Sequence, residues 1–598
     1  MLKTLLKSVR EYKVASILTP ILMVGEAAME IVIPYFTSII IGELEKLAKG
    51  ITSTVNTNTI ILYSCLMLVC ACFALLCGAL GARLAAKASC GFAHNLREDM
   101  YNNLQTFSFA NIDNYSTSSL ITRITTDVTN VQNAYQMSLR MLVRAPVLFI
   151  SSIIMTVLLE PMMAGVFAGA AVILGLIVFL CMFKVLPYFK IMFKKYDGLN
   201  AVVQEDLTAI RVVKSYVRED RENGKMRKAS QELYDYSVKA ERILTCLMPC
   251  VTLVMFTVNI LILTLGSNMA IGNIYGNVNP SEIQTLIQYS VQTLSGVMMV
   301  AMCINFISMS KGSADRICEV LNEHTTLPKA ANPVSAVADG SVEFSDVDFC
   351  YSQKADIMVL KDITVRINSG ETVGVIGATG SGKTSLVSLI PRLYDVAQGS
   401  VKVGGVDVRE YNLDALRNSV AMVLQKNVLF SGTIAENLRW GDENASDEDL
   451  RLAAKQACAD EFIENLPAKY DYDLGQGGVN VSGGQKQRLC IARAMLKKPK
   501  VIIFDDSTSA VDTKTDAQIR AALKKHAPET TKIIIAQRIA SIEDADKIIV
   551  LDDGRINGVG THEELLKTNE IYREVYESQV KGGDDNTDKE LAGGNENA

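Results

Sequence analysis

The chain has 598 residues, of which 49% are hydrophobic and 21% charged, and its formal net charge is −6. A chain of this length holds several domains, and these averages exclude a disordered, collagen-like or disulfide-scaffold protein. The charge is spread unevenly, because residues 1–300 hold 45 charged side chains and residues 301–598 hold 79. We therefore expect the two halves to fold in different solvents.

The N-terminal half contains long stretches without Asp, Glu, Lys or Arg. These stretches are 50–82, 161–183, 243–281 and 283–310. A helix needs about 20 apolar residues to cross a bilayer. We predict an all-α transmembrane domain over residues 1–325. Its six spans are expected near 14–42, 58–81, 141–159, 162–186, 245–270 and 284–309.

Two connections between the spans, 82–140 and 187–244, are long, polar and rich in helix-forming residues and cations. The positive-inside rule places these connections, and the C-terminal half that follows six spans, in the cytoplasm. Each connection has room for two helical extensions of about 25 residues, or about 40 Å at 1.5 Å per residue. We expect the extensions to turn near 115–126 and 209–218, where they either dock on another domain or remain solvated.

The first span contains two acidic residues, Glu26 and Glu30, which are four positions apart and so share one helix face. Ionisable groups inside a bilayer usually face the bundle interior or a water-filled cavity. Arg144 in the third span is a candidate partner for both. Two interpretations remain open, a structural ion pair and the lining of a substrate or proton path.

A phosphate-binding pattern, G-x-x-x-x-G-K-[ST], follows the strand-like run 372–376 and precedes the helical pattern 385–394. Its residues and the first of the helix are Gly377, Ala378, Thr379, Gly380, Ser381, Gly382, Lys383, Thr384 and Ser385. Glycines let backbone N–H groups close round phosphates at a helix N-terminus. Lys383 would supply positive charge to the phosphates, and the Thr384 hydroxyl would bind Mg²⁺. We predict an α/β nucleotide-binding domain over residues 326–580 and a disordered tail over residues 581–598.

A second nucleotide signal is the continuous apolar run 501–504, which ends in Asp505. It reads as a buried parallel strand whose terminal carboxylate reaches the Mg²⁺ ion.

Between these signals, a short motif opens the helical pattern 486–496. Its residues are Val481, Ser482, Gly483, Gly484 and Gln485. This motif resembles the Leu-Ser-Gly-Gly-Gln signature of ATP-binding cassette (ABC) transporters, with valine in place of leucine. The resemblance covers essentially the whole chain, and six spans ahead of one cassette are typical of exporter half-transporters. It implies ATP and Mg²⁺ as cofactors, and a dimer in which each signature completes the partner's ATP site.

The same resemblance assigns roles to further residues. Tyr351 corresponds to the aromatic residue that stacks on adenine, and Gln425 to the glutamine that senses Mg²⁺ and the membrane helices. Thr384, Gln425 and Asp505 then form the expected Mg²⁺ site. The segment Ser509, Ala510, Val511 and Asp512 corresponds to the loop that crosses the dimer interface.

Two positions depart from the family pattern. The general base after the strand acid is normally Glu and here is Asp506, and the later His that contacts the γ-phosphate is here Gln537. The shorter acid withdraws the carboxylate, and an amide cannot carry the imidazolium charge. With the binding motifs intact, this combination resembles the degenerate-site chain of bacterial heterodimeric ABC exporters. It implies a multi-pass protein of the bacterial plasma membrane with a distinct partner chain carrying the complete Glu/His site.

The sequence gives little information about the transported substrate. Amphipathic drugs or lipids are favoured because flexible methionine and aromatic surfaces suit varied apolar ligands. The relevant side chains are Met67, Met162, Met163, Phe167, Phe179, Met298, Met299 and Phe306. A net acidic chain without a basic stripe argues against a nucleic-acid partner. A slow homodimeric exporter, and a nucleotide-gated regulatory membrane subunit that moves no substrate, remain as alternatives.

Overall fold

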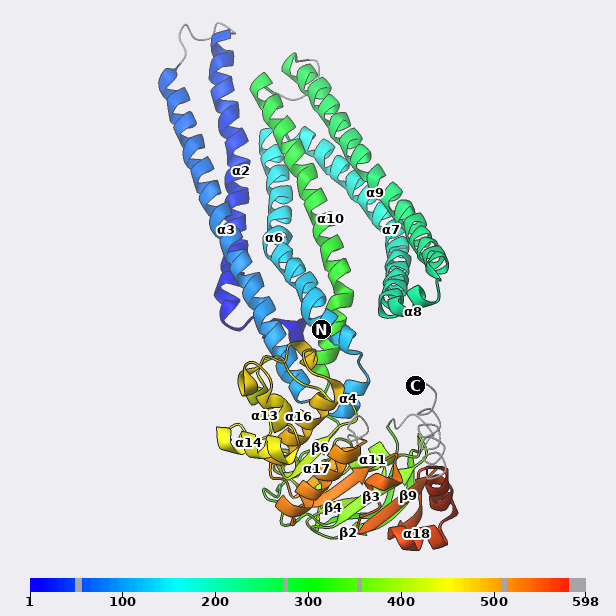
Figure 1. Ribbon diagram of the computed structural model, residues 1–598. Coiled ribbons are helices and arrows are strands. Elements are labelled where there is room, and N and C mark those ends of the chain that lie inside the picture. The colour runs from blue at the N-terminus through cyan, green and yellow to red at the C-terminus, as the bar shows by residue number, and fades with distance from the viewer. Residues whose placement is uncertain (49–55, 273–277, 352–357, 507–512, 580–598) are drawn as a thin grey trace. The chain divides into compact units, whose positions relative to one another are not determined.

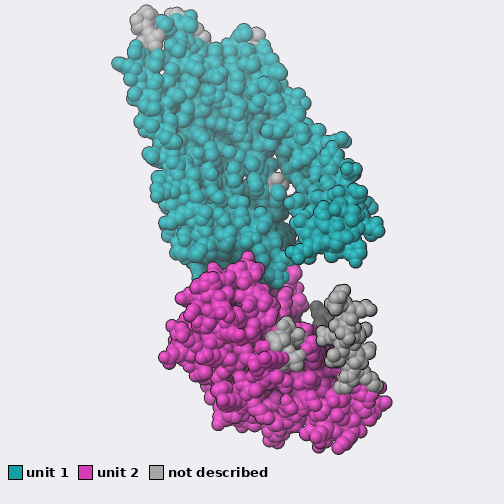
Figure 2. Space-filling view, viewed as in Figure 1, with its two compact units in different colours: residues 1–105, 117–323 teal, residues 106–116, 324–598 magenta. Residues whose placement is uncertain are grey.

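The computed structural model describes residues 1–48, 56–272, 278–351, 358–506 and 513–579. The chain divides into two compact units (Figure 2). Unit 1 holds residues 1–105 and 117–323, and unit 2 holds residues 106–116 and 324–598. The predicted domain boundary at residue 325 lies beside this division, but the prediction did not place 106–116 with the second domain. The predicted tail, 581–598, lies outside the described residues.

Within the described part of unit 1, six helices are long and apolar enough to cross a membrane. They are α2 (Lys13–Ala48), α3 (Thr57–Gln105), α6 (Val128–Leu159), α7 (Pro161–Thr208), α9 (Glu219–Ala270) and α10 (Pro280–Asn322). Each predicted span falls inside one of them, and the fold class is confirmed. Helix α9 has 52 residues, which at 1.5 Å per residue is about 78 Å, far more than a hydrocarbon layer of about 30 Å. The helices therefore continue beyond the spans.

The long helices pack mainly in pairs, α2 with α3, α6 with α10, and α7 with α9. Figure 1 shows the α7 and α9 pair diverging from the other four helices toward the turn that contains α8 (Ile210–Ser215). Helix α6 stops at Leu159 because Glu160 is extended and Pro161 begins α7, where its missing N–H costs nothing. The remaining short elements of unit 1 are α1 (Leu2–Lys7), a 3-10 helix (Arg10–Tyr12), α5 (Thr117–Thr122) and a π-helical turn (Arg123–Asp127).

The main sheet of unit 2, in the described residues, has the strand order β10-β9-β3-β8-β7-β6. Its strands are β3 (Thr372–Gly377), β6 (Val420–Val423), β7 (Val501–Asp505), β8 (Thr531–Ile535), β9 (Lys547–Asp552) and β10 (Arg555–Gly560). All neighbours run parallel except β10, which is antiparallel to β9. Every residue of β7 and β8 is buried, as expected for central strands covered on both faces.

A second, antiparallel sheet and a set of helices complete unit 2. The sheet has the order β2-β1-β4-β5 in the described residues, with strands β1 (Val342–Phe349), β2 (Leu360–Ile367), β4 (Gln398–Val403) and β5 (Val406–Asp407). The helices are α11 (Lys383–Ser388), α12 (Leu413–Ser419), α13 (Ile434–Leu438), α14 (Asp447–Gln456), α15 (Asp460–Glu464), α16 (Gly483–Leu496), α17 (Thr513–His526) and α18 (His562–Thr568). One core lies between the two sheets and α11, and the other packs α13–α17 against the main sheet.

The helix predicted over residues 385–394 is shorter in the structure. Helix α11 ends at Ser388, and two features stop it. Pro391 lacks the N–H that a further helical turn would require. The backbone of Arg392 is left-handed, with φ 51°, and its buried guanidinium binds Asp395 at 2.7 Å.

Unit 2 receives a turn of the first long connection, but not the one predicted at 115–126. Helix α4 (Phe109–Asp113) belongs to unit 2 and begins with a capping box between Ser108 and Asn111. Asn111 Nδ2 donates a hydrogen bond to the carbonyl oxygen of His324 at 3.1 Å, and the hydroxyls of Ser108 and Thr326 lie 2.7 Å apart. The turn therefore lies at 106–116, and most of the predicted range forms helix instead.

Candidate functional site

The phosphate-binding loop joins β3 to α11. Its backbone is left-handed at Gly380 (φ 86°) and Gly382 (φ 95°), which glycine adopts without steric cost. A Cβ on Gly377 would lie 2.1 Å from the carbonyl oxygen of Leu551 in β9, so this position admits no side chain. The loop can therefore fold back with successive N–H groups facing one anion.

The remaining loop residues differ in burial. Ala378, Thr379 and Gly380 are exposed at the tip, whereas Ser381 and Ser385 are buried. The buried hydroxyl oxygen of Ser381 has no hydrogen-bond partner among the described residues. An orphaned polar atom inside such a loop is consistent with a site that closes on a polar ligand.

Lys383 begins α11 and extends over the loop. Its Nζ donates hydrogen bonds to the carbonyl oxygens of Gly377 and Ala378, both at 2.8 Å. Burial lowers the pKa of Lys383, while the charges of Asp506 and Asp505 oppose that shift. The ammonium group is thus held at the loop, where it can neutralise phosphate charge.

Asp505 ends β7, beside the start of α11. The hydroxyl of Thr384 donates a hydrogen bond to Asp505 Oδ1 at 2.9 Å. Burial raises the pKa of Asp505, the Thr384 hydrogen bond lowers it, and the charge of Asp506 raises it. A hydroxyl and a carboxylate are the oxygen ligands that Mg²⁺ prefers, together with phosphate oxygens. These two side chains therefore fit the predicted ion.

Two of the predicted hydrolysis residues, Gln425 and Gln537, contact the same carboxylate oxygen of Asp506. Its Oδ2 accepts a hydrogen bond from Gln425 Nε2 at 3.2 Å and another from Gln537 Nε2 at 2.5 Å. The residue is 8% exposed and its backbone is left-handed, with φ 47°. The three residues follow β7, β6 and β8, so they meet because parallel neighbouring strands end at one edge of the sheet.

The signature motif forms the start of α16. Val481 is buried in the core, and Ser482 is the N-cap residue. Ser482 Oγ accepts from the Gln485 amide at 3.3 Å, and Gln485 Oε1 accepts from the Ser482 amide at 2.9 Å. Ser482 and Gly483 are exposed, and a Cβ on Gly483 would meet nothing within 4 Å. Gly484 follows in the first helical turn, so the motif presents an open, capped helix start on the surface.

Tyr351 lies beside the phosphate-binding loop. Its hydroxyl is 2.8 Å from that of Ser385, and its ring packs edge-on against Phe349 and Tyr394, with centroids 4.9 Å and 5.1 Å away. Nearly half of the residue is exposed, which leaves ring surface for stacking. The predicted interface loop of Ser509, Ala510, Val511 and Asp512 lies outside the described residues.

In unit 1, Arg144 of α6 contacts both acidic residues of α2. Arg144 Nη2 lies 2.6 Å from Glu30 Oε1, and Nη1 lies 3.4 Å from Glu26 Oε1. Gln292 of α10 donates to the carbonyl oxygen of Glu30 at 3.1 Å. Glu26 Oε2, Arg144 Nε and Gln292 Oε1 are buried without a hydrogen-bond partner among the described residues. Arg144 therefore forms ion pairs with both acids, and the cluster also contains buried polar atoms that make no hydrogen bond within the described residues.

Two residues near these sites were not singled out from the sequence. Gln292 had a visible signal, an amide inside the charge-free stretch 283–310. Tyr394 had none, because its partners are distant in sequence. It donates to Asp113 Oδ2 at 2.7 Å and packs against Phe109, with ring centroids 6.1 Å apart. Burial and the Asp113 hydrogen bond both raise the pKa of Tyr394. Tyr394 thus links α4 to Tyr351.

Two family models match the chain. The model for the ABC transporter transmembrane region matches residues 16–298, and the model for the ABC transporter matches residues 360–509. The first runs through the long helices of unit 1. The second begins at β2 and includes the phosphate-binding loop, the signature and Asp506.

Individual proteins agree with this match. The ABC transporter ATP-binding protein YfiB of Bacillus subtilis is 34% identical over 96% of this chain and 98% of its own length. A multidrug efflux ATP-binding/permease protein of Mycobacterium bovis is 33% identical over 81% of this chain and 40% of its own length. A bacterial Atm1-family ABC exporter solved with ATP bound has the same fold, with a TM-score of 0.81 at 24% identity over 94% of this chain and 98% of that one.

The fold and the site define a multi-pass membrane protein with one ATP-binding domain, in which ATP hydrolysis is coupled to transport. The chain belongs to the ABC transporter family. It has one membrane domain and one ATP-binding domain, the arrangement of a half-transporter with an exporter fold. Proteins of this type act as dimers.

Proposed function

We propose that this chain is the hydrolysis-weak half of a heterodimeric ABC exporter in a bacterial plasma membrane. Its own site holds ATP through Lys383 and the phosphate-binding loop, with Mg²⁺ on Thr384 and Asp505. The observation that carries the proposal is Asp506, whose Oδ2 accepts hydrogen bonds from two glutamine amides.

The chemistry of hydrolysis requires a base that orients a water molecule and takes its proton. A carboxylate oxygen offers two lone pairs, and both of those on Asp506 Oδ2 are engaged by amide donors. Aspartate also reaches one methylene less far than glutamate. Gln537 can hydrogen-bond but cannot gain or lose a proton near neutral pH. The residues therefore favour ATP binding with slow turnover, and bound Mg²⁺ would supply charge neutralisation that does not replace the base.

The signature supports a productive role for the partner's site. Ser482 and Gly483 are exposed at the start of a 14-residue helix, where free N–H groups and the helix dipole favour phosphate. A motif that served only this chain's weak site would have no need to keep this geometry. We infer that it completes the partner's ATP site, at which most hydrolysis takes place.

Uncovered apolar side chains outside the spans also support a partner chain. Near α8, Val212 is 56% exposed and Tyr216 is 73% exposed. In unit 2, the stacked rings of Phe430 and Trp440, 4.0 Å apart, leave Trp440 63% exposed. Apolar surface of this kind in charged segments marks interaction sites. We propose that both surfaces are covered when the second chain assembles.

The substrates we propose are amphipathic drugs or lipids. The M. bovis relative named a multidrug efflux protein supports this class. In the membrane unit, Arg144 engages both Glu26 and Glu30, which supports a structural ion pair. The unused atoms Glu26 Oε2 and Gln292 Oε1 would leave the cluster able to accept hydrogen bonds from a passing ligand.

The test compares the chain purified alone with the chain co-expressed with a six-span cassette protein that carries Glu and His at the two positions. Alone it should bind ATP and hydrolyse it slowly, and the partner should raise turnover well over tenfold. Release of a fluorescent ATP analogue should be slower from this chain's site than from the partner's. Brisk hydrolysis by a homodimer of this chain, or equal release from both sites, would contradict the proposal.

Transport is tested separately, in inverted vesicles that contain the assembled pair. ATP should drive uptake of rhodamine 6G or of a fluorescent phospholipid. Uptake should be absent in vesicles with Lys383→Ala in this chain and the corresponding lysine changed in the partner. Active ATP hydrolysis without uptake of either probe would favour the regulatory-subunit alternative.

A further inference from the structure

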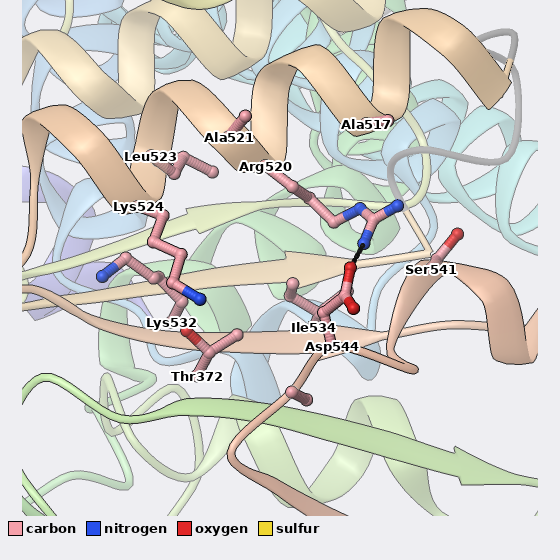
Figure 3. Close-up of a pocket in the computed structure, with 11 residues that line it drawn as sticks. Thr372, Ala517, Arg520, Ala521, Leu523, Lys524, Lys532, Ile534, Ser541 and Asp544 are labelled. Carbon is pink, nitrogen blue, oxygen red and sulfur yellow. Dashed lines mark ion pairs between the residues drawn. The ribbon is translucent and has the colours of Figure 1, made fainter. Parts of the chain in front are cut away.

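A polar cavity of unit 2 lies between helix α17 and the main sheet, and Figure 3 shows the residues that line it. Its volume is about 460 Å³, and helix α17 forms one wall. Thr372 and Lys532, near the first residues of β3 and β8, form part of the other. The same strands end at the phosphate-binding loop and just before Gln537. At about 3.3 Å per residue, the six-residue strand β3 places Thr372 roughly 17 Å from Gly377 of the phosphate-binding loop.

The key observation is Lys532. Only 4% of this residue is exposed, and its ammonium group has no hydrogen bond or ion pair within the residues that the structure describes. The stem of the side chain is packed, whereas its Nζ atom still reaches solvent, so the ammonium group faces the cavity and is open to an anion. Burial lowers the pKa of Lys532, which Asp546 opposes and Lys524 reinforces.

The charged groups at the far end of the cavity, Arg520 and Asp544, form an ion pair. Arg520 lies 3.3 Å from Asp516 and 3.6 Å from Asp544. Asp546, near Lys532, accepts a hydrogen bond from the Thr372 amide at 2.8 Å. Figure 3 shows Lys524, Lys532 and Thr372 at one end of the cavity, and the Arg520 and Asp544 pair at the other. Lys524 is exposed and has no ion-pair or hydrogen-bond partner in the described residues, so the two ammonium groups at this end of the cavity are both open to solvent.

We propose that this cavity, the lysine pocket, binds a phosphate group, either free or carried by a small metabolite, between the ammonium groups of Lys524 and Lys532. The Thr372 hydroxyl supplies a neutral donor beside them. A phosphate has about twice the charge of a carboxylate and one more acceptor oxygen, which matches two point charges and a hydroxyl. The cavity volume is in the range of small-molecule sites.

The experiment uses the full chain in detergent with a saturating concentration of a non-hydrolysable ATP analogue and Mg²⁺, so that the ATP site is occupied. Calorimetric titration with orthophosphate and with pyrophosphate should detect one saturable site, and citrate should bind more weakly. Orthophosphate binding as tightly as pyrophosphate would identify free phosphate as the ligand. Tighter pyrophosphate would identify a phosphorylated metabolite.

The variants Lys532→Met and Lys524→Met should each weaken phosphate binding at least tenfold, because each removes a charge-assisted contact. The control is Lys525→Met, which removes the same charge from an exposed neighbour that does not line the cavity.

Four results would overturn the inference. They are the absence of saturable binding, equal affinity in Lys532→Met and wild type, equal losses in Lys525→Met and Lys532→Met, and citrate binding as tight as phosphate. If Lys532→Met does not fold, Lys524→Met decides, and its unchanged affinity would refute the lysine pocket. None of these measurements depends on the hydrolysis rate.

Discussion

Placing the family's glutamate and histidine at positions 506 and 537 should raise the rate of ATP hydrolysis at this chain's site. The change is the double variant Asp506→Glu with Gln537→His. In the structure both amides contact one oxygen of Asp506, at 3.2 Å and 2.5 Å. Glutamate advances the carboxylate by one carbon–carbon bond, about 1.5 Å, and removing the Gln537 amide frees an acceptor position for water.

The magnitude follows from positioning. A displacement of about 1 Å at a reacting group costs about 100-fold in rate, so regaining that reach restores up to about 100-fold. Asp506→Glu alone should give about tenfold, because Gln537 still occupies the carboxylate. Gln537→His alone should give less than threefold, since the base remains short. The two changes should therefore be more than additive in free energy, as expected for side chains in direct contact.

The assay is phosphate release by the purified chain at saturating ATP and Mg²⁺, alone and with its partner. Asp506→Asn should abolish the residual rate while ATP binding remains, and Lys383→Ala should abolish binding itself. ATP affinity and unfolding temperature of the double variant should match the wild type. If both match and turnover rises less than twofold, the two departures do not limit the site and the reasoning fails.

Three further changes test other parts of the structure. Gly377→Ala should weaken ATP binding at least tenfold, measured by equilibrium titration, because its Cβ would fall 2.1 Å from a backbone carbonyl oxygen. Tyr394→Phe should lower vesicle uptake several-fold with ATP hydrolysis changed less than twofold; Tyr470→Phe, which loses a similar 2.8 Å bond to an aspartate, should change neither. Arg144→Met should destabilise the membrane unit by about 3 kcal/mol in thermal unfolding, and adding Glu30→Gln should restore part of that loss.

The nucleotide site was predictable from sequence because its residues follow strands. A parallel sheet brings the ends of its strands to one edge, so Lys383, Asp505 and Gln537 had to converge once the strands were recognised. The particular contact was not predictable. The hydrogen bonds of Gln425 and Gln537 to a single oxygen of Asp506 depend on neighbour order in the sheet and on the left-handed backbone of Asp506, and no local pattern encodes either.

The turn of the first long connection was misplaced for a local reason. The stretch Ser116–Ser119 reads as a turn because of its hydroxyl side chains. In the structure most of the predicted range is helical instead, and hydroxyls bond back within it: Thr122 Oγ1 donates to the Ser118 carbonyl oxygen at 2.9 Å and Thr125 Oγ1 to that of Ile121 at 2.7 Å. The true start signal was the capping box of Ser108 and Asn111, which is weak because asparagine takes the place usually held by glutamate.

The two residues that differ from the family pattern, Asp506 and Gln537, serve hydrolysis, whereas the intact motifs serve ATP binding. This difference supports an asymmetric dimer over a site that is losing its function altogether. Loss of selection on the whole site would relax the tight glycine at 377, the Lys383 cradle and the capped signature as readily as the hydrolysis residues. Instead, the phosphate-binding loop and the capped signature are intact, and the changes fall on the position of the base and on its neighbour. A chain that must close on ATP and complete its partner's site, while its own hydrolysis is dispensable, requires this combination.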